Sequence, residues 1–308
     1  MENYRANQKF RAELQTALVT GKVLFDEPMK DHTTFQIGGP ADYFILPGSQ
    51  QEVAEVMRIT AKHQIPVTVI GNGSNLLVRD GGIAGAVVAL GDNMAFMQAN
   101  GDTITVGAGA LLADVAKFTA TQKLSGAEFA IGIPGTIGGA VFMNAGAYDG
   151  EIKDIVFSVS AVTLDGQEIV LSRQELAFAY RHSIFQENHA IICEIVLSLQ
   201  VGDSAAILAK MAELTARREA KQPLDMPSAG STFKRPPGHF AGTLIEQTGL
   251  KGFQIGGAAV SEKHAGFVVN CGGATATDVL NLIAAVQQKV QAAHGILLQP
   301  EVRVIGRP

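Results

Sequence analysis

The 308-residue sequence has few cysteines, few charged residues and no long apolar run, and these shortages disfavour several classes of protein. It contains two cysteines and 17% charged residues, against 47% hydrophobic residues. No apolar run approaches the roughly 20 residues of a membrane-spanning helix, and the polar start MENYRANQKFRAEL lacks the apolar stretch of a secretory signal. A net charge of -5 disfavours nucleic acid and anionic membranes as main partners. We therefore expect a globular, cytoplasmic enzyme or binding protein without a membrane span.

Motifs of several enzyme classes are also missing. Cys193 and Cys271 lie in apolar, strand-like contexts, so we expect both to be reduced thiols and neither to bind a metal. The sequence has no HExxH, paired CxxC or GxSxG motif, no carboxylate cluster with metal spacing, and no P-loop. The glycine pairs at 38–39 and 256–257 are not followed by the helix that a dinucleotide-binding fingerprint requires. These absences favour chemistry carried by a cofactor, with no metal site.

Glycine, in contrast, is abundant, with 34 residues in no fixed period. The glycine-rich run FAIGIPGTIGGAVFMNAGA at 129–147 is predicted to be a loop, and a second such loop, GNGSN at 71–75, follows the apolar run 67–70. Successive backbone N–H groups in such loops form anion-binding nests, and small residues let a flat ligand approach the main chain. One such loop is usually only a tight turn. Two of them favour a large phosphate-bearing cofactor, held by backbone and by hydroxyls such as those of Ser74 and Thr136.

Hydrophobic periodicity and turn signals predict an α+β chain of three units, 1–90, 91–205 and 206–308. Hairpins replace regular βαβ alternation, which disfavours a Rossmann sheet. Asp165-Gly166 is a strong hairpin signal, and Gly295 is expected to cap the last helix. The predicted helices cover 2–20, 50–64, 110–123, 172–180, 203–220, 243–249 and 277–293. The predicted strands are two within 31–46 and one each at 67–70, 83–90, 103–106, 155–164, 167–171, 190–200, 267–270 and 297–305.

Seven motifs in a fixed order then connect the sequence to a known family. They are TFQIGGPAD (34–42), GNGSNLLV (71–78), GIPGTIGGAVFMNAGAY (132–148), AYRHS (179–183), PSAGSTFKRP (227–236), IGGAAVSEKHAGF (255–267) and QPEVRVIG (299–306). Together they resemble the UDP-N-acetylenolpyruvylglucosamine reductases, the flavoenzymes known as MurB. The resemblance implies a vanillyl-alcohol-oxidase-like FAD-binding region of two subdomains, 1–90 and 91–205, and a substrate-binding domain, 206–308. Because no tyrosine-bearing insertion is present, the sequence resembles the shorter subclass.

The resemblance also implies which residues bind the cofactor. The loops 71–76 and 132–139 would hold the FAD pyrophosphate, and Asn144 with Gly146 would lie near the flavin. Neither loop contains a histidine or cysteine, so we expect FAD to be bound non-covalently. The implied cofactor-binding positions are Gly71, Asn72, Gly73, Ser74, Asn75, Leu76, Ile133, Pro134, Gly135, Thr136, Gly138, Gly139, Asn144 and Gly146.

The implied reaction, in peptidoglycan precursor synthesis, is a two-step hydride relay. NADPH would reduce FAD, and reduced FAD would deliver a hydride to the enolpyruvyl double bond of UDP-N-acetylenolpyruvylglucosamine, giving UDP-N-acetylmuramate. Negative charge then develops on C2 and its carboxylate, which calls for stabilisation and for a proton. By resemblance, Arg181 would bind the carboxylate in a fork, Glu301 would sit on the same carboxylate, and Ser231 would donate the proton to C2. The implied sugar-nucleotide positions are Tyr180, Lys221, Arg235 and His264.

Taken alone, each of these side chains has a simpler interpretation. Arg181 and Lys221 could be solvated cations at helix ends, Ser231 a turn hydroxyl, and Glu301 a surface partner of Arg303. Two other functions also stay open: a flavin oxidase that returns electrons to oxygen, and a flavin- or UDP-sugar-binding protein without turnover. No separate nicotinamide motif occurs, so we expect NADPH and the sugar nucleotide to take turns over the flavin. No obligate protein partner is inferred.

Overall fold

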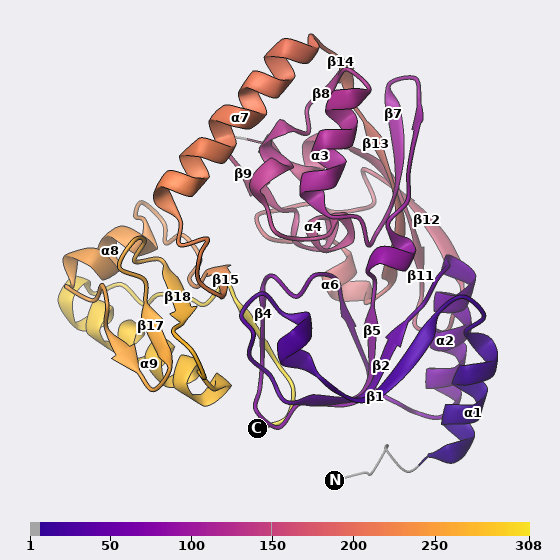
Figure 1. Ribbon diagram of the computed structural model, residues 1–308, viewed down its shortest axis with the longest axis horizontal. Helices are drawn as coiled ribbons and strands as arrows, with labels where there is room; N and C mark the ends of the chain where they lie inside the picture. Colours follow the sequence, from indigo (N-terminus) through magenta and orange to yellow (C-terminus); the bar gives the residue numbers. More distant parts are fainter. Residues whose placement is uncertain (1–6, 149) are drawn as a thin grey trace. The chain divides into compact units, whose positions relative to one another are not determined.

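The computed structural model describes residues 7–148 and 150–308, which divide into two compact units (Figure 1). The first unit comprises the chain up to Phe25, Asp42–Asn72 and Gly85–Arg217, and the second comprises Asp26–Ala41, Gly73–Ala84 and Arg218–Pro308. The chain therefore passes between the units within the first predicted glycine loop, after Asn72. The three-domain division stays a prediction, because two FAD-binding subdomains can belong to one compact unit.

Two larger β-sheets form the first unit. One has the strand order β1-β2-β5-β3, with β3 parallel to β5, and the other has the order β12-β11-β13-β7-β6 with antiparallel pairing. Their strands are β1 (Lys22–Pro28), β2 (Pro40–Leu46), β3 (Val67–Ile70), β5 (Ile83–Ala89), β6 (Met97–Asn100), β7 (Thr103–Gly107), β11 (Val156–Val162), β12 (Glu168–Ser172) and β13 (Ile191–Ser198). Short pairs are formed by β8 (Leu124–Ser125) with β14 (Gln200–Val201) and by β9 (Gly146–Ala147) with β10 (Gly150–Glu151).

The first unit has six complete α-helices among the described residues. They are α1 (Gln8–Ala17), α2 (Gln50–Lys62), α3 (Leu112–Thr121), α4 (Ile137–Met143), α5 (Ile152–Ile155) and α6 (Phe185–Asn188). α2 begins where the Ser49 side chain accepts a hydrogen bond from the Glu52 backbone (3.2 Å), and it buries one apolar face. α1 and α2 lie side by side (Figure 1). The predicted hairpin at Asp165-Gly166 is confirmed, since β11 and β12 pair antiparallel around it and Gly166 has a φ of +80°.

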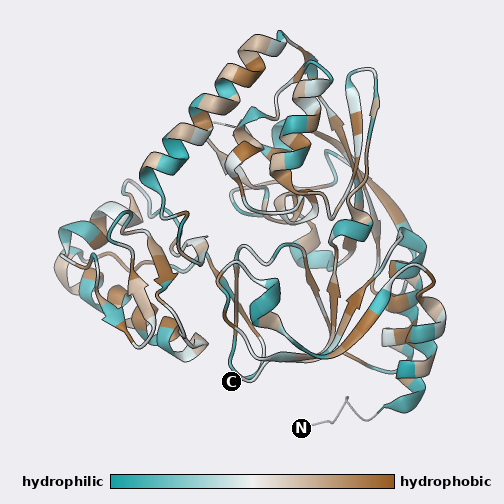
Figure 2. Ribbon diagram, viewed as in Figure 1, coloured by the Kyte–Doolittle hydropathy of each residue, from teal (hydrophilic) through white to brown (hydrophobic). Residues whose placement is uncertain are grey.

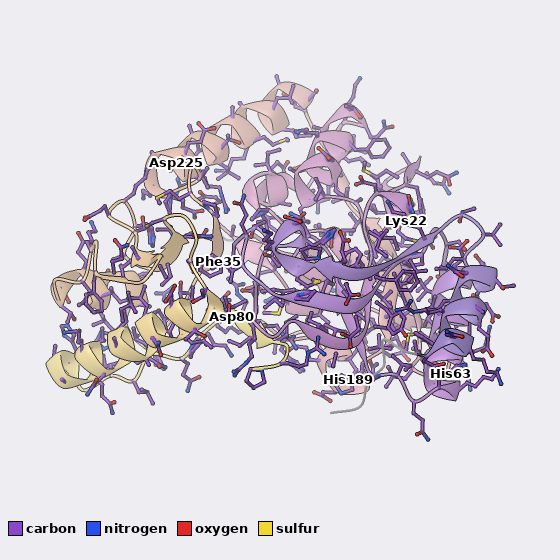
Figure 3. The ribbon with its side chains drawn as sticks, turned by 60° about the horizontal axis from the view of Figure 1, so that its bottom comes forward. Lys22, Phe35, His63, Asp80, His189 and Asp225 are labelled. Atoms are coloured by element: carbon purple, nitrogen blue, oxygen red, sulfur yellow. The ribbon has the colours of Figure 1, made fainter. Side chains whose placement is uncertain are left out.

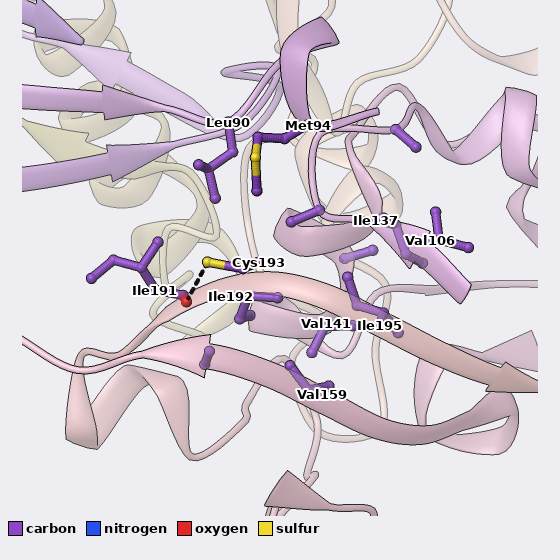
Figure 4. Packing of buried hydrophobic residues seen from close by; sticks show 14 of the residues in the cluster. Leu90, Met94, Val106, Ile137, Val141, Val159, Ile191, Ile192, Cys193 and Ile195 are labelled. Carbon is purple, nitrogen blue, oxygen red and sulfur yellow. Dashed lines mark hydrogen bonds between the residues drawn. The ribbon is translucent and has the colours of Figure 1, made fainter. Parts of the chain in front are cut away.

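A continuous hydrophobic core fills the first unit, and its strands are largely apolar (Figure 2). Cys193 on β13 lies inside this core, where its thiol donates a weak hydrogen bond to the Ile191 carbonyl (Sγ···O 3.4 Å; Figure 4). Burial raises the pKa of the Cys193 thiol to about 12, so the thiol is protonated near neutral pH. Cys271 is exposed, and both cysteines are free thiols.

The second unit has its own core beneath a sheet of order β15-β18-β17-β16. Its elements are β4 (Leu76–Val78), β15 (Ser228–Ser231), α8 (Ala241–Gln247), β16 (Gln254–Ile255), β17 (Ala258–Val260), β18 (Phe267–Asn270), α9 (Ala276–His294) and β19 (Arg303–Ile305). α7 (Ser204–Lys221) runs from the first unit into the second. α9 starts at a capping box of Thr275 and Asp278, and the Asp80 carboxylate (Figure 3) accepts a hydrogen bond from the Ala276 N–H (2.8 Å). Gly295 ends α9 with a φ of +70°, as predicted.

Three predicted elements are wrong, and a fourth is longer than the strand that exists. The glycine-rich run forms the helix α4 over residues 137–143, because Thr136 caps its first turn and Asn144 ends it in the left-handed conformation. Residues 172–180 form turns instead of a helix, and the Glu175 carboxylate accepts a hydrogen bond from the Ser172 N–H (2.8 Å). Only the second strand expected within 31–46 exists, as β2. The strand predicted at 297–305 shortens to β19, which pairs parallel with β4.

The other predicted helices and strands exist with boundaries shifted by a few residues. Residues 2–6 of the first predicted helix lie outside the described residues. Within residues 7–148 and 150–308, no helix is both long and apolar enough to cross a bilayer.

Candidate active site

The two predicted cofactor loops meet inside the first unit. The Asn72 amide Nδ2 donates a hydrogen bond to the Pro134 carbonyl (2.6 Å), which ties the first loop to the second. Gly71 lies so close to Thr136 that a Cβ on Gly71 would stand 2.2 Å from Thr136 Oγ1. Glycine at position 71 is therefore required by the packing of one loop against the other. The sequence placed these loops 60 residues apart but gave no sign of this contact.

Backbone donors are available where the loops meet. Among the described residues, none accepts a hydrogen bond from the backbone N–H groups of Gly71, Asn72, Gly135 or Thr136. The Thr136 hydroxyl, in contrast, is buried and accepts from the Gly139 N–H (3.3 Å) as the cap of α4. A Cβ on Gly139 would meet nothing in the protein closer than 3.5 Å, so the protein itself does not require glycine there. Backbone N–H groups without a protein acceptor, next to a glycine that the protein's own packing does not require, suit the pyrophosphate of a dinucleotide such as FAD.

The remainder of the first loop lies in the second unit. Gly73 has a φ of +61°, and a Cβ there would stand 2.2 Å from the His32 carbonyl oxygen, so no other residue fits. Asn75 connects this loop to the chain around Glu301: its amide Nδ2 donates to the Glu301 carbonyl (3.4 Å), and its own carbonyl accepts from the Arg303 N–H (3.0 Å). Ser74 and Leu76 follow in sequence, with Leu76 starting β4. A predicted cofactor loop and a predicted catalytic residue are thus joined within one unit.

Ser231 and Glu301 come from neighbouring chain segments of the second unit. Ser231 is the exposed last residue of β15, placed opposite Phe267 after a register shift. The Glu301 N–H donates to the carbonyl of Thr232, the residue after Ser231 (2.8 Å). The backbone pairing of 299–301 with 232–234 therefore places two of the three predicted catalytic residues in adjacent segments, although they are 70 positions apart in sequence.

Arg181 belongs to the first unit, where it forms the corner of a tight turn. The backbone groups of Ala179 and His182 bond each other in both directions (3.2 Å each), which leaves Tyr180 and Arg181 at the tip. Arg181 has a φ of +54°, a left-handed value that such turns usually assign to glycine or asparagine. The guanidinium carbon stands 5.2 Å from the centroid of the Tyr180 ring, and Tyr180 is 57% exposed. The turn therefore places the Arg181 and Tyr180 side chains next to each other at its tip.

Asn144, predicted to lie near the flavin, has a buried side chain that is committed to the protein. Its amide Nδ2 donates to Glu151 Oε2 (3.1 Å) and to the Ala179 carbonyl (3.0 Å), and its Oδ1 accepts from the Lys153 N–H (3.0 Å). Gly146 pairs with Glu151 across β9 and β10, and a Cβ on Gly146 would stand 2.8 Å from Glu151 Cγ. The sequence prediction missed Glu151; its spacing from Asp154 indicates only a helix cap.

Three of the four predicted sugar-nucleotide residues lie in the second unit. Lys221 is the last residue of α7, and the Arg235 guanidinium carbon stands 4.1 Å from the centroid of the Phe240 ring. His264 Nδ1 accepts a hydrogen bond from the Gly266 N–H (3.1 Å). Burial lowers the pKa of His264, with smaller contributions from nearby cations that include Lys221. His264 is therefore neutral at pH 7, and its Nε2 carries the proton.

The lowered His264 pKa predicts a pH-dependent stability. The folded state binds this proton less readily than the unfolded state, whose histidine titrates near 6.5. The free energy of unfolding should therefore fall as pH drops below about 6.5, and the loss should level off below the folded pKa. His264→Asn, whose Oδ1 can accept from Gly266, should show less of this loss in chemical denaturation at pH 5.5 to 8 (about the range in which histidine titrates). The exposed histidine variant His239→Asn is the control. A stability difference between wild type and His264→Asn that does not change with pH would contradict the prediction.

Comparison with known proteins first defines the class. Residues 41–172 match the family model described as "FAD binding domain". A solved alkyldihydroxyacetonephosphate synthase shares the fold, with a TM-score of 0.51 and 18% identity over 65% of this chain and 41% of that one. With the glycine-loop geometry above, these matches define an FAD-binding flavoprotein with a vanillyl-alcohol-oxidase-like fold and a separate C-terminal domain.

The C-terminal domain and the full-length relatives define the family. Residues 222–305 match the model "UDP-N-acetylenolpyruvoylglucosamine reductase, C-terminal domain". The UDP-N-acetylenolpyruvoylglucosamine reductase of Caldanaerobacter subterraneus subsp. tengcongensis is 49% identical over 96% of this chain and 97% of its own length. The crystal structure of the Thermus caldophilus reductase (MurB) matches with a TM-score of 0.80 and 36% identity over 92% of this chain and 98% of that one. The chain belongs to this family of FAD-dependent oxidoreductases.

Proposed function

We propose that the protein reduces the enolpyruvyl group of UDP-N-acetylenolpyruvoylglucosamine to give UDP-N-acetylmuramate in peptidoglycan precursor synthesis, with NADPH as the hydride donor. The observation that carries the proposal is the full-length match to reductases of this name, at 49% identity. The meeting of the two glycine loops supports it, because that junction offers free backbone amides for a dinucleotide. The free thiols of Cys193 and Cys271 are consistent with a cytoplasmic location.

FAD would be held by main-chain donors of the two loops, without a covalent bond. Gly71, Asn72, Gly135 and Thr136 supply N–H groups in the first unit, and the same loop continues as Gly73–Leu76 in the second. Neither loop has a histidine or cysteine for covalent attachment. When bound, FAD would accept a hydride from NADPH and transfer a hydride to the enolpyruvyl double bond.

Charged and hydroxyl side chains of the protein would stabilise the negative charge that develops on the substrate and would supply the proton to C2. Arg181 would bind the substrate carboxylate in a bidentate fork and stabilise the negative charge that grows on it. Ser231, exposed at the end of β15, would give its hydroxyl proton to C2, and the cation of Lys234 or Arg235 would stabilise the alkoxide. Glu301 would act at the same carboxylate, either protonated or through a bridging cation.

Tyr180, Lys221, Arg235 and His264 would bind the sugar nucleotide. The two cations would meet the diphosphate, and the neutral His264 would contribute its Nε2–H as a hydrogen-bond donor. This assignment makes 206–308 the substrate-binding domain, in line with the C-terminal family match, and makes 1–90 and 91–205 the FAD-binding subdomains. NADPH and the sugar nucleotide would occupy the site in turn.

Steady-state turnover distinguishes this proposal from its two competitors. The reductase consumes one NADPH for each sugar nucleotide and yields a product heavier by two hydrogens in mass spectrometry. A flavin oxidase would consume NADPH and oxygen without the sugar nucleotide. A binding protein would retain FAD and the sugar nucleotide but form no product. Either of the last two results would overturn the proposal.

A further inference from the structure

The turn that carries Arg181 needs support from outside itself. A non-glycine residue with positive φ costs about 1–3 kcal/mol and persists only where surrounding contacts enforce it. Two such contacts reach the turn: the Gln186 amide Nε2 donates to the Arg181 carbonyl (3.0 Å), and the Asn144 amide Nδ2 donates to the Ala179 carbonyl (3.0 Å). The Ala179 carbonyl also accepts the hydrogen bond that closes the turn. The orientation of the Asn144 amide is therefore part of what fixes the position of Arg181.

Glu151 is one of the groups that orient the Asn144 amide. An asparagine side chain can present its nitrogen or its oxygen to a neighbour. Here both nitrogen donors face acceptors, Glu151 Oε2 and the Ala179 carbonyl, while Oδ1 faces the Lys153 N–H. An ionised carboxylate can only accept a hydrogen bond, so Glu151 favours this orientation together with the Ala179 carbonyl and the Lys153 N–H. Asn144 is 1% exposed, so water cannot replace the protein groups that bond its amide.

The charges around Glu151 keep it ionised and relate it to Arg181. Lys153 Nζ stands 2.7 Å from Glu151 Oε2, and this hydrogen bond is the main cause that lowers the pKa of Glu151. The Asn144 amide and the charges of Lys153 and Arg181 lower that pKa further, while burial acts in the opposite direction. Glu151 is therefore a carboxylate at neutral pH whose field reaches the Arg181 guanidinium.

We propose that Glu151 is a positioning residue for Arg181, which acts by fixing the Asn144 amide against the Ala179–His182 turn. The inference rests on the proposed role of Arg181 at the substrate carboxylate. Glu151 would touch neither substrate nor flavin. It would place the arginine fork where charge grows on the substrate, and displacement of such a group by about 1 Å can cost a hundredfold in rate.

The test compares Glu151→Gln with wild type in the two half-reactions and in local backbone mobility. Glutamine keeps the size but carries an NH₂ group that can face Asn144 as a second donor. We expect unchanged FAD content and a flavin reduction rate by NADPH within about twofold of wild type. Reoxidation of the flavin by the sugar nucleotide should slow by about tenfold to a hundredfold. Hydrogen–deuterium exchange should rise at residues 179–183, because local opening of the turn becomes easier.

The control is Glu187→Gln, since Glu187 pairs with His182 of the same turn (3.1 Å) from an exposed position. It should leave both half-reactions unchanged.

Equal rates for Glu151→Gln and wild type in the sugar-nucleotide step would overturn the inference. A parallel loss of FAD, stability and both half-reactions would also overturn it, because such a loss indicates a purely structural role. If Glu151→Gln does not fold, Glu151→Asp serves: it keeps the charge but moves the carboxylate back, and wild-type rates in it would overturn the inference. A wild-type flavin that the sugar nucleotide does not reoxidise would instead overturn the proposed function, and the inference with it.

Discussion

Ser231→Ala is expected to slow the reoxidation of reduced flavin by the sugar nucleotide by about 10²- to 10⁴-fold, the usual contribution of a positioned proton donor. The substitution removes one hydroxyl from an exposed strand end, so the fold and the FAD content should not change. Flavin reduction by NADPH needs no proton at C2, and its rate should match wild type. Anaerobic stopped-flow absorbance of the flavin measures both steps separately.

The matched control for this prediction is Ser228→Ala in the same strand. Ser228 contributes its backbone carbonyl, which accepts from the Thr34 hydroxyl (2.7 Å), and alanine retains that group. The control should therefore reoxidise at the wild-type rate. A Ser231→Ala protein that reduces the sugar nucleotide at full rate would show that another group protonates C2.

Arg181→Lys is expected to lower kcat/KM for the sugar nucleotide by about 10²- to 10³-fold, even though the positive charge is kept. Lysine offers a single ammonium in place of a planar fork, so it cannot bind both carboxylate oxygens in the same geometry. The charge that develops on that carboxylate is the charge the arginine is proposed to stabilise, so most of the loss should appear in kcat. Steady-state kinetics with varied sugar nucleotide separate kcat from KM.

Arg173→Lys makes the same chemical change at an exposed arginine of the first unit and should leave kcat and KM unchanged. The FAD content of Arg181→Lys should equal that of wild type, since Arg181 is not assigned to the cofactor. An effect confined to KM would indicate that Arg181 only binds the substrate. An unchanged kcat/KM would contradict its role entirely.

Local sequence signals predicted much of the fold because many of its elements are locally determined. The hairpin at Asp165-Gly166 and the end of α9 at Gly295 depend on residues next to each other in sequence, and both were predicted. The helix α4 was not predicted, since glycine is a poor helix former and the glycine-rich run around Gly138 and Gly139 indicates a loop. Tertiary contacts stabilise it instead, with Ile137 and Val141 fully buried. The short strand β19 depends on β4, more than 200 residues earlier, and no local pattern reports such pairing.

In the candidate site, too, some features could be predicted from the sequence and others could not. Glycine runs gave both cofactor loops, and the motif resemblance gave Arg181, Ser231 and Glu301. What sequence could not give was the contacts between distant segments. The hydrogen bond from Asn72 to Pro134 joins residues 62 positions apart, and the bond from Asn144 to Ala179 joins residues 35 apart. Glu151 has no motif of its own, because its hydrogen bond with the Asn144 side chain forms only in the folded chain.

The absorbance spectrum of the purified protein, followed anaerobically through the addition of NADPH and then of UDP-N-acetylenolpyruvoylglucosamine, tests the central claim most directly. The account predicts a yellow protein whose flavin band is bleached by NADPH and restored by the sugar nucleotide before any air is admitted. A flavin band that returns only with air would contradict the reductase in favour of an oxidase. A colourless protein that cannot take up FAD would contradict the account from the glycine loops onward.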